Sequence, residues 1–126
     1  MKRWRSWIAL CWIAAAPAAA AGPGDPLTED ARANRTFVLG EFVSETCPAC
    51  DEMASVVRAV LEKYPQVHHQ VYDADRQVDL AKKYGVRCVP VYVVVDPQGQ
   101  VRFNDVGVRT VEELEAILRQ AGVPPR

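Results

Sequence analysis

The sequence has few of the residues on which several classes of small protein depend. It holds four cysteines among 126 residues, too few and too closely spaced for a disulfide-stapled scaffold. Two histidines and two methionines leave no His-rich or Met-rich stretch that would favour metal handling. Basic residues are not in excess, since the formal net charge is −1, so nothing electrostatic favours nucleic-acid binding. The length fits one small domain, and we find no internal repeat.

Tryptophan is absent beyond Trp12, because all three tryptophans lie in an unusual N-terminal segment. That segment starts with basic residues, continues with the apolar run 7–16, which includes Cys11, and ends in small residues. This order is typical of a secretory signal peptide, so we expect residues 1–21 to be cleaved and the protein to be periplasmic. An uncleaved anchor is the alternative, although the run is short for a spanning helix. Cleavage would move the formal net charge to about −4.

The rest of the chain reads as a leader with a short helix over residues 22–35 and one domain over residues 36–123. Apolar periodicity predicts a β-α-β-α-β-β-α order. The predicted elements are strand 37–43, a helix from Cys47 to about Tyr64, strand 67–72, helix 75–84, strands 91–95 and 101–103, and a final helix from about 111. A crossover helix implies a parallel pair, and the last hairpin adds antiparallel pairing. We therefore predict an α/β fold with a mixed sheet of about four strands flanked by helices.

Two cysteines three residues apart, Cys47 and Cys50, lie at the start of the most regular predicted helix. Pro48 suits the first helical position, where the N–H that it lacks would have no helical partner. Cys47 thus lies where free N–H groups and the helix dipole stabilise a thiolate, which is the nucleophilic form. A redox-active pair is the favoured interpretation, and a static disulfide or half of a zinc site is the alternative.

With these motifs in place, the chain resembles the thioredoxin family over residues 37–121. The resemblance depends on the strand, loop and CxxC helix, on a Val89-Pro90 dipeptide about forty residues later, on the Gly99 turn, and on Glu41 six residues before Cys47. The sequence also departs from the family. Thr46 replaces the usual Trp, Pro48-Ala49 replaces Gly-Pro, Glu41 replaces Asp, and no strand is predicted before residue 37.

The resemblance implies a role for each of these residues. Cys47 would attack a substrate disulfide, and Cys50 would resolve the mixed disulfide. Glu41, in an apolar strand where a carboxylate is costly, would accept the proton of Cys50. Pro90 would be cis and would hold the Val89 backbone against an extended substrate. Thr46, Pro48, Ala49 and Val89 would line the substrate-binding surface, and the Cys47–Cys50 disulfide would serve without any added cofactor or metal.

The remaining thiol and the two histidines carry weaker signals. Cys88, two residues before Pro90, is either an accessory thiol, a bridge in a disulfide-linked dimer, or a small, partly buried loop residue. His68 and His69 are neighbours on a strand, so they point to opposite faces and cannot bind one metal together. We interpret both histidines as structural or surface residues.

These features predict a periplasmic thiol–disulfide oxidoreductase, more in the reducing than in the oxidising direction. The resemblance carries this direction, because Glu41 resembles the buried acid of reducing thioredoxins. In addition, no His lies between the cysteines, where strong oxidants of the superfamily carry one. Its partners would be exported proteins with cysteines and a membrane thiol-electron transporter, and it would act as a monomer. The alternatives are a disulfide-forming oxidant of the same fold, a copper-handling protein that uses Cys47, Cys50 and Cys88, and a redox-inert adaptor.

Overall fold

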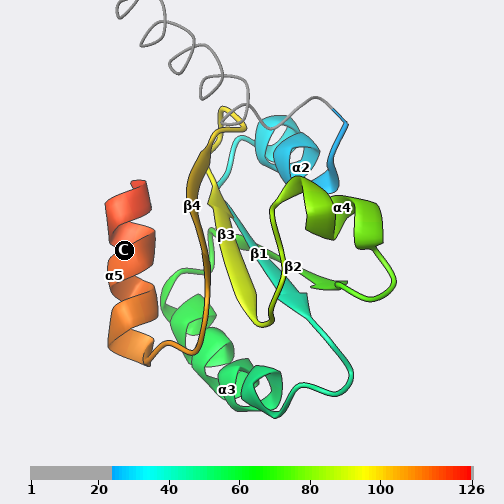
Figure 1. Cartoon of the computed structure of the whole chain (residues 1–126). Coiled ribbons are helices and arrows are strands. Elements are labelled where there is room, and N and C mark those ends of the chain that lie inside the picture. The colour runs from blue at the N-terminus through cyan, green and yellow to red at the C-terminus, as the bar shows by residue number, and fades with distance from the viewer. Residues whose placement is uncertain (1–23, 126) are drawn as a thin grey trace, which may run out of the picture.

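The computed structural model describes residues 24–125, so the predicted signal peptide lies outside the described residues. The elements, in chain order, are α2 (Pro26–Asn34), β1 (Val38–Val43), α3 (Pro48–Lys63), β2 (His68–Asp73), α4 (Val78–Lys83), β3 (Val91–Val95), β4 (Val101–Val106) and α5 (Val111–Ala121). Four strands form one sheet in the order β2-β1-β3-β4 (Figure 1). β1 is parallel to β2 and antiparallel to β3, and β3 is antiparallel to β4. The predicted mixed four-stranded sheet is confirmed.

Helices cover both faces of the sheet, with α3 and α5 on one face and α2 and α4 on the other (Figure 1). The alternation in β1 divides its side chains between two cores. Leu39 packs with residues of α3 and α5, whereas Val38 and Phe42 pack with residues of α2 and α4, and all three are fully buried. β1 is therefore a central strand that fixes which side chains face the CxxC helix.

Helix α2 belongs to the packed unit. The sequence predicts a domain that starts at residue 36, but Leu27 and Ala31 of α2 are fully buried in the second core. Asp25 caps the helix by accepting hydrogen bonds from the backbone N–H groups of Leu27 and Thr28 at 2.9 and 3.0 Å. The structure thus extends the folded unit back to α2.

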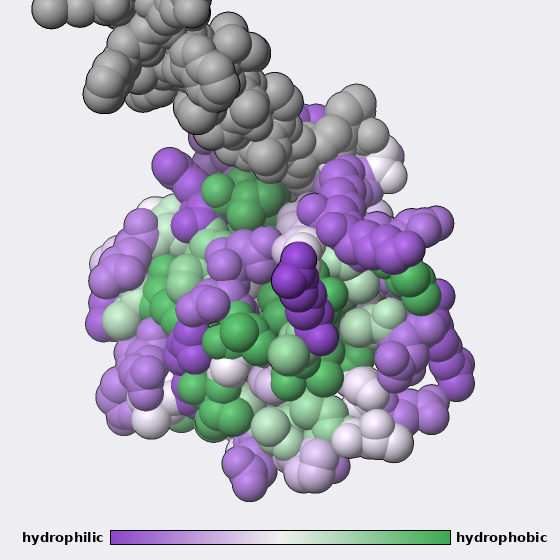
Figure 2. Space-filling view, in the orientation of Figure 1, coloured by the Kyte–Doolittle hydropathy of each residue, from purple (hydrophilic) through white to green (hydrophobic). Residues whose placement is uncertain are grey.

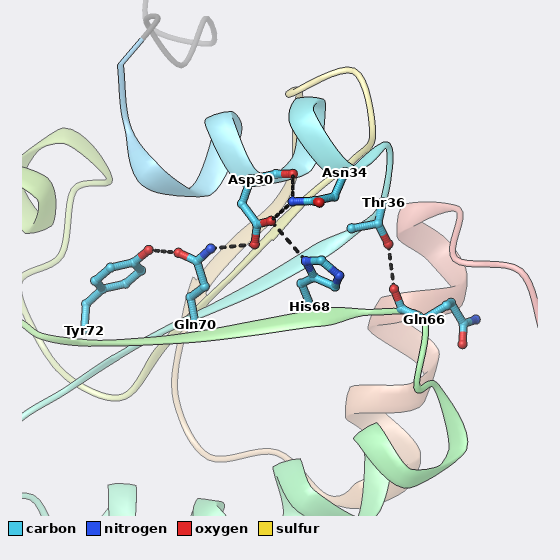
Figure 3. A network of polar contacts seen from close by, with 7 residues as sticks. All are labelled: Asp30, Asn34, Thr36, Gln66, His68, Gln70 and Tyr72. Atoms are coloured by element: carbon cyan, nitrogen blue, oxygen red, sulfur yellow. Dashed lines mark hydrogen bonds and ion pairs between the residues drawn. The ribbon is translucent and has the colours of Figure 1, made fainter.

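Polar contacts also bind α2 to β2 (Figure 3). The Asp30 carboxylate lies 3.0 Å from Nδ1 of His68 and accepts a 2.6 Å hydrogen bond from the Gln70 amide. Tyr72 donates in turn to Gln70, so alternate residues of β2 contribute to one network (Figure 3). The network explains why this face of an exposed edge strand carries polar side chains.

Two predicted boundaries, the start of α4 and the end of β4, differ from the structure by three residues. Helix α4 starts at Val78 rather than near residue 75, because the Asp73 carboxylate accepts the N–H of Asp75 and forms a turn there instead. Strand β4 continues beyond Phe103 to Val106, since it pairs with β3 as far as Val91.

Candidate active site

The two cysteines lie where the sequence places them, at the start of α3. Cys47 is the N-cap residue, Pro48 occupies the first turn, and Cys47 and Cys50 form a disulfide with a Cα–Cα distance of 5.3 Å. The backbone N–H of Cys50 donates to Sγ of Cys47 at 3.1 Å. Both cysteines are about nine-tenths buried or more. A thiolate formed at Cys47 on reduction would therefore start with a donor directed at it.

Sheet register brings the proline loop to the same end of the sheet. Phe42 is paired with Val91, so the loop that leaves β1 towards the cysteines and the loop that enters β3 lie at the same end of the sheet (Figure 1). The Val89–Pro90 peptide bond is cis, the isomer expected from the resemblance. The Pro90 carbonyl accepts the N–H of Gly107 at 2.9 Å, which adds the β4–α5 loop to this end.

Exposure differs among the residues predicted to contact substrate. Thr46 and Pro48 are exposed, Ala49 and Val89 are half-buried, and Pro90 is buried. In Figure 2, white and pale shades prevail at the lower end of the molecule, where these loops lie. The exposed carboxylates Glu45, Asp51 and Glu52 flank the two cysteines in the chain, so the surroundings of the disulfide combine weakly polar and acidic residues.

Glu41 lies below the disulfide on the α3 side of the sheet. It is 5% exposed and lines, together with Cys50, a cavity of about 630 Å³ between α3 and the edge of β2. The predicted burial of this carboxylate is confirmed. Tyr92 is its register partner on β3, and burial together with the charge of Glu41 raises the pKa of the Tyr92 hydroxyl well above its usual range.

His69 also belongs to this site, a position that the sequence does not predict. Its Nε2 lies 3.6 Å from Oε2 of Glu41, and the His69 ring lines the same cavity. The predicted opposition of the two histidines is confirmed, because His68 contacts Asp30 on the other face. Interpreting both as structural or surface residues was incomplete. Parallel pairing places His69 beside Leu39, on the same face of the sheet as Glu41. The register of β1 and β2 is therefore the signal that identifies His69 as a residue of this site.

Cys88 is a free and exposed thiol. The alternative that it is a small, partly buried loop residue is therefore wrong. It lines a smaller cavity of about 320 Å³ with residues of the α4–β3 loop, β3 and β4, separate from the one beside Glu41. Within residues 24–125, no three His, Cys, Asp or Glu side chains are arranged to hold a metal ion. Cys88 therefore does not join Cys47 and Cys50 in such a group.

Comparison with known proteins agrees with this geometry. The thioredoxin family model matches residues 27–120. The chain belongs to the thioredoxin family. Thioredoxin-2 of Pyricularia oryzae is 29% identical over 66 residues, which cover 52% of this chain and 39% of that protein. The chain thus spans about two fifths of that curated relative.

Solved thioredoxins share the fold. A mutant thioredoxin from Halobacterium salinarum superposes with a TM-score of 0.68 at 26% identity, over 81% of this chain and 89% of that one. Fasciola hepatica thioredoxin gives a TM-score of 0.66 at 24% identity, over 75% and 90% of the two chains. Family membership and the Cys47–Cys50 pair together support thiol–disulfide oxidoreductase chemistry at this site.

The part of the chain that the structure describes includes no helix both long and apolar enough to cross a membrane.

Proposed function

We propose that the protein is a periplasmic thiol–disulfide oxidoreductase that reduces disulfides of exported proteins. The observation that carries the proposal is the placement of Cys47 at the N-cap of α3 above a buried acid, Glu41, that shares a cavity with Cys50. The structure holds the Cys47–Cys50 disulfide, the form that the pair takes once it has reduced a substrate disulfide.

The reaction needs two exchange steps. The Cys47 thiolate attacks one sulfur of the substrate disulfide, which forms a mixed disulfide and releases the other substrate sulfur as a thiolate. Cys50 then loses its proton to Glu41 and attacks Sγ of Cys47. The second substrate thiolate leaves, and the Cys47–Cys50 disulfide remains. Two electrons have passed to the substrate, so a membrane thiol-electron transporter would restore the dithiol.

Substrate would bind at the sheet end where the loops meet. The half-buried Val89 precedes Pro90, so its backbone is available to pair with an extended chain as an added strand would. The exposed Thr46 and Pro48 and the half-buried Ala49 would contact the residues next to the substrate disulfide. Small side chains here, where relatives carry a Trp before the first cysteine, leave room for a bulky protein substrate.

The reduction potential of the pair tests the direction. We expect a value on the reducing side, near the roughly −270 mV of thioredoxin, by equilibration with glutathione and thiol-trapping. A value near about −120 mV would show a disulfide-forming oxidant instead. Cys50→Ser should trap a mixed disulfide with exported proteins in cells, and Cys47→Ser should trap none. Recovery of both variants only from the cytosolic fraction would contradict the periplasmic location.

A further inference from the structure

In the proposed reaction, the proton of Cys50 is transferred to Glu41, whose carboxyl lines the cavity beside Cys50. Once Glu41 has taken the proton of Cys50, that proton must reach solvent before the next cycle, yet the side chain is 5% exposed. Oε2 of Glu41 has no hydrogen-bond partner among the described residues. The carboxyl therefore needs a neighbour that can both accept a proton and touch water.

We propose that His69 carries this proton between Glu41 and solvent, an inference that rests on the proposed function. Its Nε2 is 3.6 Å from Oε2 of Glu41, and its side chain is 28% exposed. Neutral imidazole takes the proton from the Glu41 carboxyl and becomes imidazolium, and imidazolium then releases the proton to water. Only the bonds to the proton change in these steps, and no electron is transferred. His69 acts through Glu41, so it is a positioning and relay residue.

The other ionisable groups around the cavity fit this role less well. Arg58 of α3 lines the cavity, but its guanidinium group is a donor only and has no atom that accepts a proton. Tyr92 of β3 holds its proton because burial raises the pKa of its hydroxyl. Asp51 and Glu62 of α3 also line the cavity, and both are exposed carboxylates. Among these groups His69 alone combines a short distance to Glu41 with a ring nitrogen that can both accept and release a proton.

The position of His69 at an edge strand completes the route. β2 is the outer strand of the described sheet, and Val71, two residues further on the same face, is 53% exposed. The cavity between β2 and α3 is therefore accessible from the side of the molecule as well as from the disulfide. A small base such as imidazole can enter it if the His69 ring is removed.

The test uses His69→Gly and His69→Gln in the full chain, with His68→Gln as the matched control. His68 is the adjacent histidine, but it faces α2 and contacts Asp30. The rate of Cys50-dependent resolution of a mixed disulfide is measured by stopped flow from pH 5.5 to 8.5. We expect both His69 variants to lose at least about tenfold in rate at neutral pH and to show a flatter pH profile than the unchanged protein over this range. His68→Gln should stay within twofold of the unchanged protein.

Added imidazole separates a relay from a structural role. Millimolar imidazole should restore most of the rate of His69→Gly and leave His68→Gln unaffected, a result that misfolding would not give. Equal rates and pH profiles for His69→Gln and His68→Gln, or no rescue of a slow His69→Gly, would overturn the inference while the oxidoreductase proposal stands. An unchanged protein that reduces no disulfide at all would overturn both.

Discussion

Asp25 shows how one carboxylate can connect the start of α2 with the end of α4. It caps α2, accepts a 2.8 Å hydrogen bond from the hydroxyl of Tyr84, and lies 3.1 Å from Nζ of Lys83, although it is only 3% exposed. Burial alone would raise the pKa of Asp25. The hydrogen bonds from Thr28, Tyr84 and Lys83 outweigh that effect and hold the pKa below its usual value.

This residue leads to a prediction about stability in acid. Because the pKa of Asp25 is lower in the folded protein, its contribution is complete above the unfolded value near 3.9 and declines as pH falls below it. Asp25→Asn should cost about 2 kcal/mol of unfolding free energy at pH 7 and clearly less at pH 3, by urea denaturation. The exposed Asp79→Asn is the control and should change stability by under about 0.5 kcal/mol. An equal loss at both pH values for Asp25→Asn would contradict the assignment.

At the scale of elements, α5 depends on its first turn. Thr110 caps the helix by accepting the N–H of Glu113 at 3.1 Å, and the Glu113 carboxylate accepts the N–H of Thr110 at 3.4 Å. This capping box orients the face that packs against α3, with Leu114 and Leu118 fully buried. The cap therefore supports one side of the core beneath the cysteines.

Removing the cap should weaken the domain without changing its chemistry. Thr110→Ala should lower the unfolding free energy by about 1 kcal/mol in urea, because two backbone donors of the first turn lose their partners or their geometry. Thr110→Ser keeps the hydroxyl and should retain most of the stability. Similar losses for the two variants would assign the effect to the Thr methyl group rather than to the cap.

The elements also show what the sequence can and cannot predict. Central strands such as β1 and β3 were predicted with almost their true limits, because buried runs with polar ends specify length directly. The start of α4 was not, since the Asp73 side chain competes locally for backbone donors. The contact between His69 and Glu41 joins two strands through a parallel register, which periodicity within one strand does not contain.

At the scale of the whole molecule, three buried tyrosines set the alkaline limit. Burial raises the pKa of Tyr72 to about 12 and those of Tyr84 and Tyr92 well above their usual range, with nearby carboxylates adding to each shift. The folded protein therefore keeps protons that the unfolded chain loses near pH 10. Stability should be constant below that pH with respect to these groups and should fall as pH rises above it.

Chemical denaturation between pH 9 and 11.5 measures this loss. Each tyrosine should contribute about 1.4 kcal/mol per pH unit above its unfolded pKa, so Tyr92→Phe should make the decline shallower by about that amount. Tyr92 is suited to the test because it is 1% exposed. A decline of unchanged steepness in Tyr92→Phe would show that other groups determine the alkaline limit.

The disulfide between Cys47 and Cys50 closes a ring of only four residues. Ring closure this small removes little conformational freedom from the unfolded chain, about 2 kcal/mol, compared with nearly 5 kcal/mol for a ring of a hundred residues. The two cores and the caps of α2 and α5, which are independent of that bond, must supply most of the free energy of folding. The protein can therefore give up its disulfide and regain it many times while it stays folded, and the reduced form should be cleaved by proteases at most about thirtyfold faster than the oxidised form.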